Sequence, residues 1–184
     1  MVLPQLTPDV GAEPTVGAPP PAFRPLCNQP LHVRIGGHSV FNGPGLTSAQ
    51  KNGLRYEAKA QVYLRDWFQT HTDFTYLLQP HITFDNGPRP RTIIPDGLAL
   101  EPNGLVTIFE VKSQHMPEAW WQLRRLYEPV VRNLSFVRST SCVEVVRSYD
   151  PAMGFPELVE TFSDPAQLLR APRSLFKVLI WRPR

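Results

Sequence analysis

The sequence predicts an α/β protein in which a central mixed β-sheet is flanked by helices. Residues 47–69 carry apolar side chains at helical spacing, whereas residues 96–112 read as two short strands joined by a tight turn. Helical and strand-like segments alternate farther along, so the order is helix, three or four strands, helix, strand, short helix and strand. A chain of 184 residues with 42% apolar residues suits a single domain with a sizeable core.

Bulk composition narrows the setting and the class of partner. No apolar run approaches the roughly 20 residues that span a bilayer, and the N-terminus lacks the basic start and apolar block of a signal peptide. We therefore expect a cytoplasmic protein with no membrane partner, in which Cys27 and Cys142 are reduced thiols. The net charge is +3, from 15 arginines and four lysines against the acidic residues. Because arginine forms planar, bidentate contacts with phosphate, this balance permits a nucleic-acid partner without requiring one.

The first part of the chain divides into an arm and the start of the folded domain. Residues 1–30 hold eight of the 21 prolines and little patterned apolar sequence, which predicts an extended or disordered arm. Residues 31–41 alternate apolar and polar side chains around Gly36-Gly37, which predicts a β-hairpin. We expect this hairpin to open a domain that spans residues 31–184.

A long helix is expected next, beginning at Thr47 or the residue after it and ending near Gln69. Thr47 and Gln50 have the spacing of a capping box, in which each side chain bonds the backbone of the other residue. The apolar face of this helix is broad, and Lys59 and Gln61 are expected to face solvent.

The remaining elements give shorter signals. Pro117 opens a second helix, which Pro129 should kink or end, because proline removes a helical hydrogen bond. Asp164, followed by proline, should cap a short helix. Short apolar runs predict further strands over residues 74–78, 81–84, 143–146 and 174–181.

The strand pair in residues 96–112 brings charged residues together. A three-residue turn at Pro102-Asn103-Gly104, with the glycine in the left-handed region, makes Asp96 the cross-strand partner of Glu110. Side chains alternate along a strand, so both acids and Lys112 point to one face of the sheet. One face is therefore aliphatic for most of its length and ends in Asp, Glu and Lys.

Two carboxylates placed in this way suit a hard divalent cation. Asp96 and Glu110 would supply oxygen ligands to Mg²⁺ or Mn²⁺, and the Val111 backbone carbonyl could add another. Lys112 would orient an attacking water or stabilise the charge that develops during phosphodiester cleavage. A second ion would need a further acid, for which Glu57 in the long helix is the candidate. The alternative is an ordinary ion cluster at a strand end, although two opposed like charges destabilise a strand pair without a cation.

In these residues the chain resembles the PD-(D/E)XK nuclease superfamily. The resemblance covers Glu57 in a helix, Pro95-Asp96 on one strand and Glu110-Val111-Lys112 on the next, and it spans about residues 48–181. It implies a restriction-endonuclease-like core that cleaves phosphodiesters with a divalent metal. Asp96 and Glu110 would be metal ligands, Lys112 the catalytic lysine and Glu57 the helix acid.

The resemblance also implies a polar residue on the helix that follows the lysine strand. Gln122 is the candidate, with Tyr127 near it. The spacing between these two residues is one residue longer than the Gln-x-x-x-Tyr pattern of the exonuclease-like branch.

We predict a Mg²⁺-dependent DNA endonuclease, with Mn²⁺ as a substitute, in a mobile-element, phage or repair and recombination setting. Its small size suggests a homodimer or a larger assembly. Arg124, Arg125 and Arg132 are the candidates for binding DNA phosphates, the alternative being simple solvent exposure. A DNA exonuclease, or a catalytically inactive nucleic-acid-binding or assembly protein on the same core, are the other functions that fit. An interaction domain that uses the proline-rich arm as a ligand is a further alternative.

Overall fold

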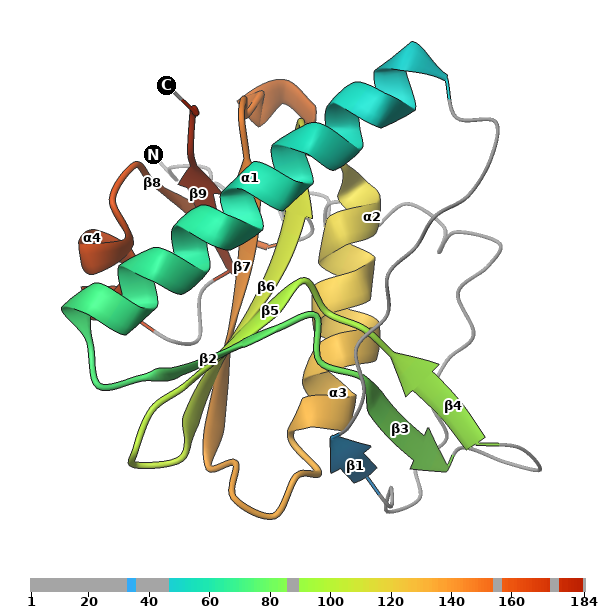
Figure 1. Cartoon of the computed structure of the whole chain (residues 1–184), viewed down its shortest axis with the longest axis vertical. Helices are drawn as coiled ribbons and strands as arrows, with labels where there is room; N and C mark the ends of the chain where they lie inside the picture. The colour runs from blue at the N-terminus through green and yellow to red at the C-terminus, as the bar shows by residue number, and fades with distance from the viewer. Residues whose placement is uncertain (1–32, 36–46, 86–89, 154–156, 173–175, 184) are drawn as a thin grey trace, which may run out of the picture.

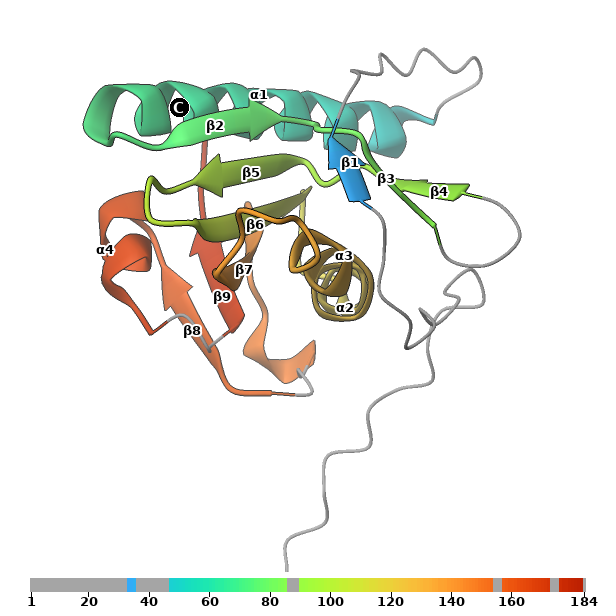
Figure 2. The ribbon, with the colours of Figure 1, turned by 90° about the horizontal axis from the view of Figure 1, so that it is seen from below.

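We describe the fold from a computed structural model of the chain, for residues 33–35, 47–85, 90–153, 157–172 and 176–183. These residues confirm the expected α/β class: helices flank a six-stranded mixed sheet, and a smaller three-stranded sheet lies beside it (Figure 1). Figure 2 shows the layers, with helix α1 (Ser48–His71) on one side of the sheet and a second helical segment on the other. None of the helices in these residues is both long and apolar enough to cross a membrane.

The six-stranded sheet is antiparallel on one side and parallel on the other. In spatial order its strands are β2 (Thr75–Leu78), β5 (Gly97–Leu100), β6 (Leu105–Lys112), β7 (Ser139–Val146), β9 (Phe176–Ile180) and β8 (Val159–Phe162). The pairs β2–β5 and β5–β6 are antiparallel, whereas β6–β7, β7–β9 and β9–β8 are parallel. The carboxyl ends of β6, β7 and β9 therefore meet at one edge of the sheet.

Helix α1 begins where the sequence predicts. Thr47 is its N-cap, and the Gln50 backbone N–H donates to the Thr47 hydroxyl while the Thr47 N–H donates to the Gln50 side chain. The apolar face of α1 packs on β2, β5, β6, β7 and β9 in a cluster that includes Tyr56, Ala60, Leu64, Phe68, Phe109, Val143 and Leu179. This burial holds α1 across the sheet (Figure 1).

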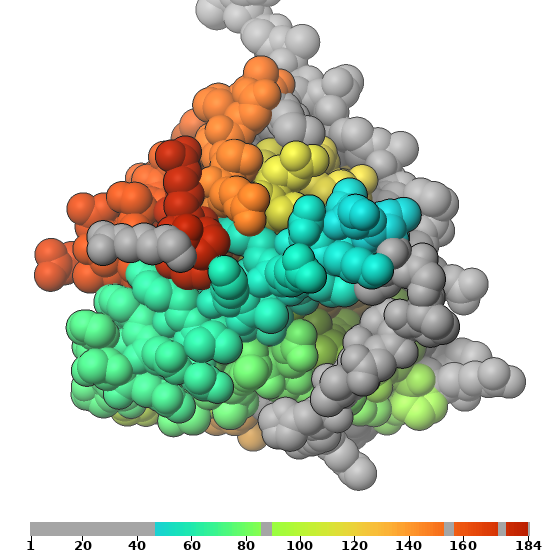
Figure 3. All heavy atoms as spheres, turned by 45° about the horizontal axis from the view of Figure 1, so that its top comes forward, coloured from blue at the N-terminus to red at the C-terminus, as the bar shows by residue number. Residues whose placement is uncertain are grey.

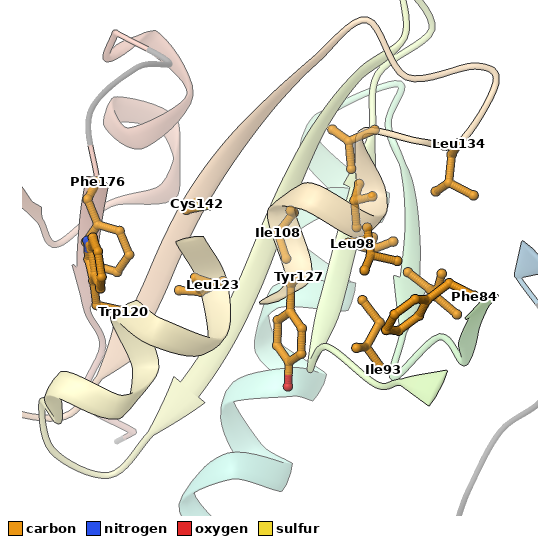
Figure 4. Close-up of a cluster of buried hydrophobic side chains, with 14 of the residues drawn as sticks. Phe84, Ile93, Leu98, Ile108, Trp120, Leu123, Tyr127, Leu134, Cys142 and Phe176 are labelled. Atoms are coloured by element: carbon orange, nitrogen blue, oxygen red, sulfur yellow. The ribbon is translucent and has the colours of Figure 1, made fainter. Parts of the chain in front are cut away.

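One continuous helical segment covers the opposite face and changes its hydrogen-bonding pattern along its length. It consists of α2 (Pro117–Trp120), a π-helical segment η1 (Trp121–Tyr127) and α3 (Glu128–Val131). Its buried side chains pack on Leu98, Ile108, Cys142 and Phe176, among others, as Figure 4 shows.

Pro129 was expected to kink or end this helix, and the helix does not end there. The helix continues to Val131, and Pro129 lies in the first turn of α3, directly after η1. Proline destabilises a helix little in its first turn, where its missing N–H removes no regular hydrogen bond. Here the i→i+4 hydrogen bonding has already been interrupted by the π-helical segment η1.

The β5–β6 hairpin has the register expected from its turn. Gly97 pairs with Phe109, so continuing the ladder by one residue places Asp96 opposite Glu110. Gly104 has φ 84°, in the region that favours glycine, and its N–H donates to the Glu101 carbonyl at 3.0 Å. The turn therefore determines which acids face each other.

In the smaller sheet, β3 (Ile82–Asp85) lies between β1 (Val33–Ile35) and β4 (Pro90–Ile93), and both pairs are antiparallel. The sequence did not predict β4. β4 begins at a proline, which disfavours a strand, and β8 was also missed because its side chains are mostly exposed. The proline-rich arm, and most of the hairpin predicted for residues 31–41, lie outside the described residues.

The last helix, α4 (Pro165–Arg170), follows a short 3₁₀ turn η2 (Pro151–Met153) and strand β8. Asp164 caps α4 as expected, and its side chain accepts a hydrogen bond of 2.9 Å from the Ala166 N–H. At the other end of α4, the buried Lys177 ammonium donates to the Leu168 and Ala171 carbonyls. These contacts fasten α4 to β9.

Gly97 and Gly53 offer a matched test of packing beside the charged residues. Gly97→Ala should destabilise the protein by roughly 1–3 kcal/mol, because overpacking has this cost and the new Cβ would lie 2.0 Å from the Tyr76 hydroxyl oxygen. Gly53→Ala, in α1 with nothing within 4 Å of the new Cβ, should instead gain about 0.5–1 kcal/mol. Urea unfolding measures both, and a Gly97→Ala protein as stable as wild type would contradict this packing.

Candidate active site

The hairpin brings the two predicted acids to one end of the sheet. Asp96 directly precedes β5, while Glu110 and Lys112 lie at the end of β6. The Val111 N–H donates a hydrogen bond of 2.7 Å to Asp96 Oδ2, which fixes this carboxylate against the backbone of β6. Asp96 and Glu110 are only 8% and 4% exposed. Ordinary strand-end acids would be solvated, so this burial sets the pair apart.

Helix α1 adds a third acid and an amide. Gln61 Nε2 donates to Asp96 Oδ1 at 2.9 Å and to Glu57 Oε1 at 3.4 Å. The expectation that Gln61 faces solvent is wrong, because this side of α1 closes over the ends of β5 and β6 and buries the amide. The sequence contained the signal: Gln61 follows Glu57 by four residues, so the two share a helix face.

Lys112 places a positive charge among these acids. Its Nζ lies 2.5 Å from Glu110 Oε1, and its side chain is 28% exposed. Burial works against its charge, but Glu110, and with it Asp96 and Glu57, raise the pKa of Lys112 on balance. The lysine therefore remains an ammonium and neutralises part of the acid cluster.

The carboxyl groups are desolvated and repel one another. Burial raises the pKa of Glu110 to about 8, with Asp96 adding to the rise and Lys112 opposing it. Burial, the Asp96 charge and a hydrogen bond to Asp96 raise the pKa of Glu57 to about 7. Burial also raises the pKa of Asp96, against the opposing hydrogen bond from Val111. A divalent cation between these groups would relieve both desolvation and repulsion.

A pocket of about 320 Å³ opens beside the acids. Figure 3 shows this face of the molecule, where the N-terminal half of α1 (cyan) lies beside α2 (yellow). The pocket is lined by Gln50, Gly53, Leu54, Glu57, Val111, Lys112, Ser113 and Met116. Glu57 and Lys112 therefore open onto this pocket, whereas Asp96 and Glu110 are not among its lining residues.

The oxygen donors near Asp96 would suit Mg²⁺, which keeps water ligands, better than a metal ion whose ligands all come from the protein. The described part of the chain has no group of three or more His, Cys, Asp or Glu side chains arranged around a metal position. Asp96 and Glu110 are two oxygen donors, Glu57 lies beside Asp96, and the Val111 carbonyl is at the same strand end. Mg²⁺ usually takes one or two carboxylates and completes its shell with water and substrate phosphate, so Asp96 and Glu110 are the residues that could hold one ion.

Gln122 and Tyr127 both lie in the π-helical segment η1. In an α-helix these residues would point roughly 140° apart, at about 100° per residue. The wider i→i+5 turn of a π-helix reduces this angle and would bring the two side chains closer to one side. Burial and then Glu110 raise the pKa of Tyr127, so its hydroxyl lies near the acids, and Figure 4 shows it directed out of the apolar cluster. Gln122 Oε1 is buried without a hydrogen-bond partner among the described residues.

Two of the arginines predicted to bind DNA lie on the same helical segment. Arg124 is 13% exposed, and its guanidinium contacts Glu157 at 2.7 Å and Glu128 at 3.1 Å. Arg125 is exposed and lies over the Trp120 ring, at 5.4 Å from its centroid. Arg124 thus ties the helical segment to the residues before β8, and Arg125 lies on its outer surface.

The third arginine is far from the acids. Arg132 is 62% exposed, contacts Glu128 at 2.7 Å and donates to the Thr140 hydroxyl. Thr140 pairs with Val106 near the start of β6, six residues before Lys112. At about 3.3 Å per residue the two ends are roughly 20 Å apart. The structure thus does not bring Arg132 to the acid cluster.

A buried His–Glu pair supports the loop that leaves β6, and the sequence gave no sign of it. His115 Nδ1 lies 2.6 Å from Glu144 Oε2, and the Met116 N–H donates to Glu144 Oε1 at 3.2 Å. Glu144 is opposite Glu110 in the parallel β6–β7 ladder. These contacts set the path of the chain from Lys112 into α2.

Comparison of the chain with protein-family models, with curated proteins and with solved structures finds no significant match. The chemistry of the site must therefore be inferred from its residues.

A divalent cation should stabilise the protein more at high pH than at low pH. The raised pKa values mean that Glu57 and Glu110 favour the folded state below their unfolded pKa, and that this contribution is lost as pH rises through about 7 and about 8. Mn²⁺ would bind the ionised carboxylates rather than the protonated ones. It should therefore raise the Tm by several degrees at pH about 8.5 and only slightly at pH about 5.5.

Glu110→Gln should abolish this Mn²⁺-dependent rise in Tm, whereas Glu160→Gln, an exposed position in β8, should keep it. A rise that does not depend on pH, or that persists in Glu110→Gln, would place the cation elsewhere.

Proposed function

We propose that the chain is a Mg²⁺-dependent DNA endonuclease with a restriction-endonuclease-like core. The convergence of Asp96, Glu110 and Lys112, with Glu57 of α1 beside them, carries this proposal. Mutually repelling carboxylates are costly to bury, and a structural role alone would not require two buried acids with a third, half-buried acid beside them. An open pocket is lined by Glu57, Val111 and Lys112, and a phosphodiester that entered it would meet this side of the group.

The arrangement of the elements supports the same conclusion. The acids and the lysine lie on an antiparallel hairpin, the helical segment α2–η1–α3 then crosses one face of the sheet, and β7 pairs parallel with β6. Helix α1, which carries Glu57, covers the other face. This order matches the PD-(D/E)XK resemblance seen in the sequence over residues 48–181.

Each residue has a distinct task in the proposed reaction. Asp96 and Glu110 would hold Mg²⁺, which would supply Lewis-acid polarisation of a phosphoryl oxygen and a lowered pKa for water. Gln61 and the Val111 N–H keep the Asp96 carboxylate in one orientation. The Lys112 ammonium positions the attacking water or stabilises the negative charge of the transition state. Glu57, with a pKa of about 7, is suited to accept a proton from that water near neutral pH.

A DNA exonuclease is the second candidate, and one observation favours it. The η1 segment would bring Gln122 and Tyr127 closer to one helix side despite the extra residue between them. The chain then departs less from the Gln-x-x-x-Tyr pattern of the exonuclease-like branch than its spacing alone indicates.

Incubation with supercoiled plasmid and Mn²⁺ or Mg²⁺ tests the proposal. The wild-type protein should nick or linearise the closed circle, which only an endonuclease can do. Asp96→Asn and Lys112→Met should each lower the rate by at least about 100-fold, because each removes a group that acts in the transition state. Glu160→Gln is the control and should cut at the wild-type rate.

The rival outcomes are distinct. Digestion of linear DNA without attack on the circle would select the exonuclease. No cleavage of either substrate, or full activity of Asp96→Asn, would contradict the proposed site.

A further inference from the structure

We propose that DNA is held by a basic edge, formed by Arg147, Arg182, Arg55 and Lys59, that adjoins the acid cluster and binds backbone phosphates next to the scissile one. Its place beside the cleavage site rests on the proposed function, whereas its affinity for DNA does not. The three arginines singled out from the sequence for DNA binding, Arg124, Arg125 and Arg132, are not part of this edge.

Arg147 and Arg182 together line a pocket. They follow the carboxyl ends of β7 and β9, and with Ser148 and Pro183 they surround a hollow of about 480 Å³. Arg182 Nε donates to the Arg147 carbonyl at 3.4 Å, which keeps the two residues adjacent. The Arg147 guanidinium lies over the Tyr56 ring, at 5.2 Å from its centroid. A guanidinium supported in this way is preorganised for a planar, bidentate contact with phosphate.

These two charges are not neutralised within the described part of the chain. Arg124 and Arg132 are paired with Glu128 or Glu157, whereas neither Arg147 nor Arg182 has a carboxylate within salt-bridge distance among the described residues. Both are exposed. Their charge is therefore available to an anionic partner.

The sheet connects this pair to the acid cluster. Lys112 pairs with Val146 in β7, and Val146 pairs with Ile180 in β9, so the three strand ends form one row. The Arg147 N–H donates to the carbonyl of Ser113, the residue after Lys112, at 3.3 Å. With strands about 4.8 Å apart, the chain at Arg147 and at Arg182 lies roughly one and two strand spacings from β6. Long side chains at those points can reach phosphates that flank a phosphate bound at Lys112.

Helix α1 extends the positive charge along the same side. Tyr63 stacks on Trp181 with ring centroids 4.9 Å apart, and the Tyr56 hydroxyl donates to the Trp181 carbonyl. Lys59 lies three residues after Tyr56 and four before Tyr63, so it is their neighbour on the helix surface, and Arg55 precedes Lys59 by one turn. Both are exposed. Figure 3 shows α1 (teal) directly beside the C-terminal residues (red) and the segment after β7 (orange).

Measurement of binding without cleavage tests the basic edge. The full chain is titrated against a fluorescently labelled DNA duplex in EDTA at several salt concentrations, with polyglutamate as an acidic competitor. Arg147→Ala/Arg182→Ala should weaken binding on the order of tenfold at low salt and lower the slope of log K against log salt by about 2, one for each lost phosphate contact. Polyglutamate should compete poorly.

The control removes two other exposed arginines, in Arg138→Ala/Arg170→Ala. Arg138 precedes the first residue of β7, whereas Arg147 follows its last, so the two variants test opposite ends of one strand. The control should bind DNA within about twofold of wild type, and thermal melting should show that both variants are folded.

The outcomes separate this inference from the proposed function. Four results would each overturn the basic edge. Two concern the variants: an unchanged salt slope in Arg147→Ala/Arg182→Ala, or an equal loss of DNA binding in the control variant. The other two concern the wild-type protein: no binding of DNA, or displacement of DNA by polyglutamate at equal charge. DNA binding that depends on the pair in a protein that never cuts DNA would support the basic edge and refute the nuclease proposal. Cleavage of DNA by a protein whose DNA binding does not depend on Arg147 and Arg182 would support the nuclease proposal and refute the basic edge.

Discussion

The hydrogen bond from the Val111 N–H to Asp96 Oδ2 is the contact on which the site depends. It exists because the turn closed by Gly104 fixes the hairpin register and places Asp96 at the point where β6 ends. The second oxygen of Asp96 accepts a hydrogen bond from Gln61, so the same carboxylate also positions α1. Asp96 thus joins the hairpin to helix α1, which covers the hairpin. Glu110 lies in the same buried surroundings as Asp96.

This arrangement stores unfavourable charge. Burial raises the pKa of Glu57 to about 7 and that of Glu110 to about 8, and the Lys112 ammonium, in contact with Glu110, compensates for only part of the desolvation. A divalent cation between these acids would offset part of that cost. The basic edge proposed for DNA binding lies outside this group, so the proposed binding and the proposed chemistry can be tested separately.

The sequence predicted what local spacing determines. The capping box of α1, the turn closed by Gly104 and the register of the β5–β6 hairpin each depend on residues close in the chain, and each prediction was confirmed. The burial of Gln61 was missed because it depends on how α1 packs across the hairpin. The pairing of Arg124 with Glu157 was missed for the same reason: the partners are 33 residues apart, and only the fold shows which arginines are already neutralised.

Crystals soaked in Mn²⁺ and measured at a wavelength where manganese scatters anomalously test the central claim most directly. We expect an anomalous peak about 2.0–2.3 Å from carboxylate oxygens of both Asp96 and Glu110, with the Lys112 ammonium displaced from Glu110. Absence of a peak there, with Lys112 still bound to Glu110, would contradict the claim that these acids form a cation site.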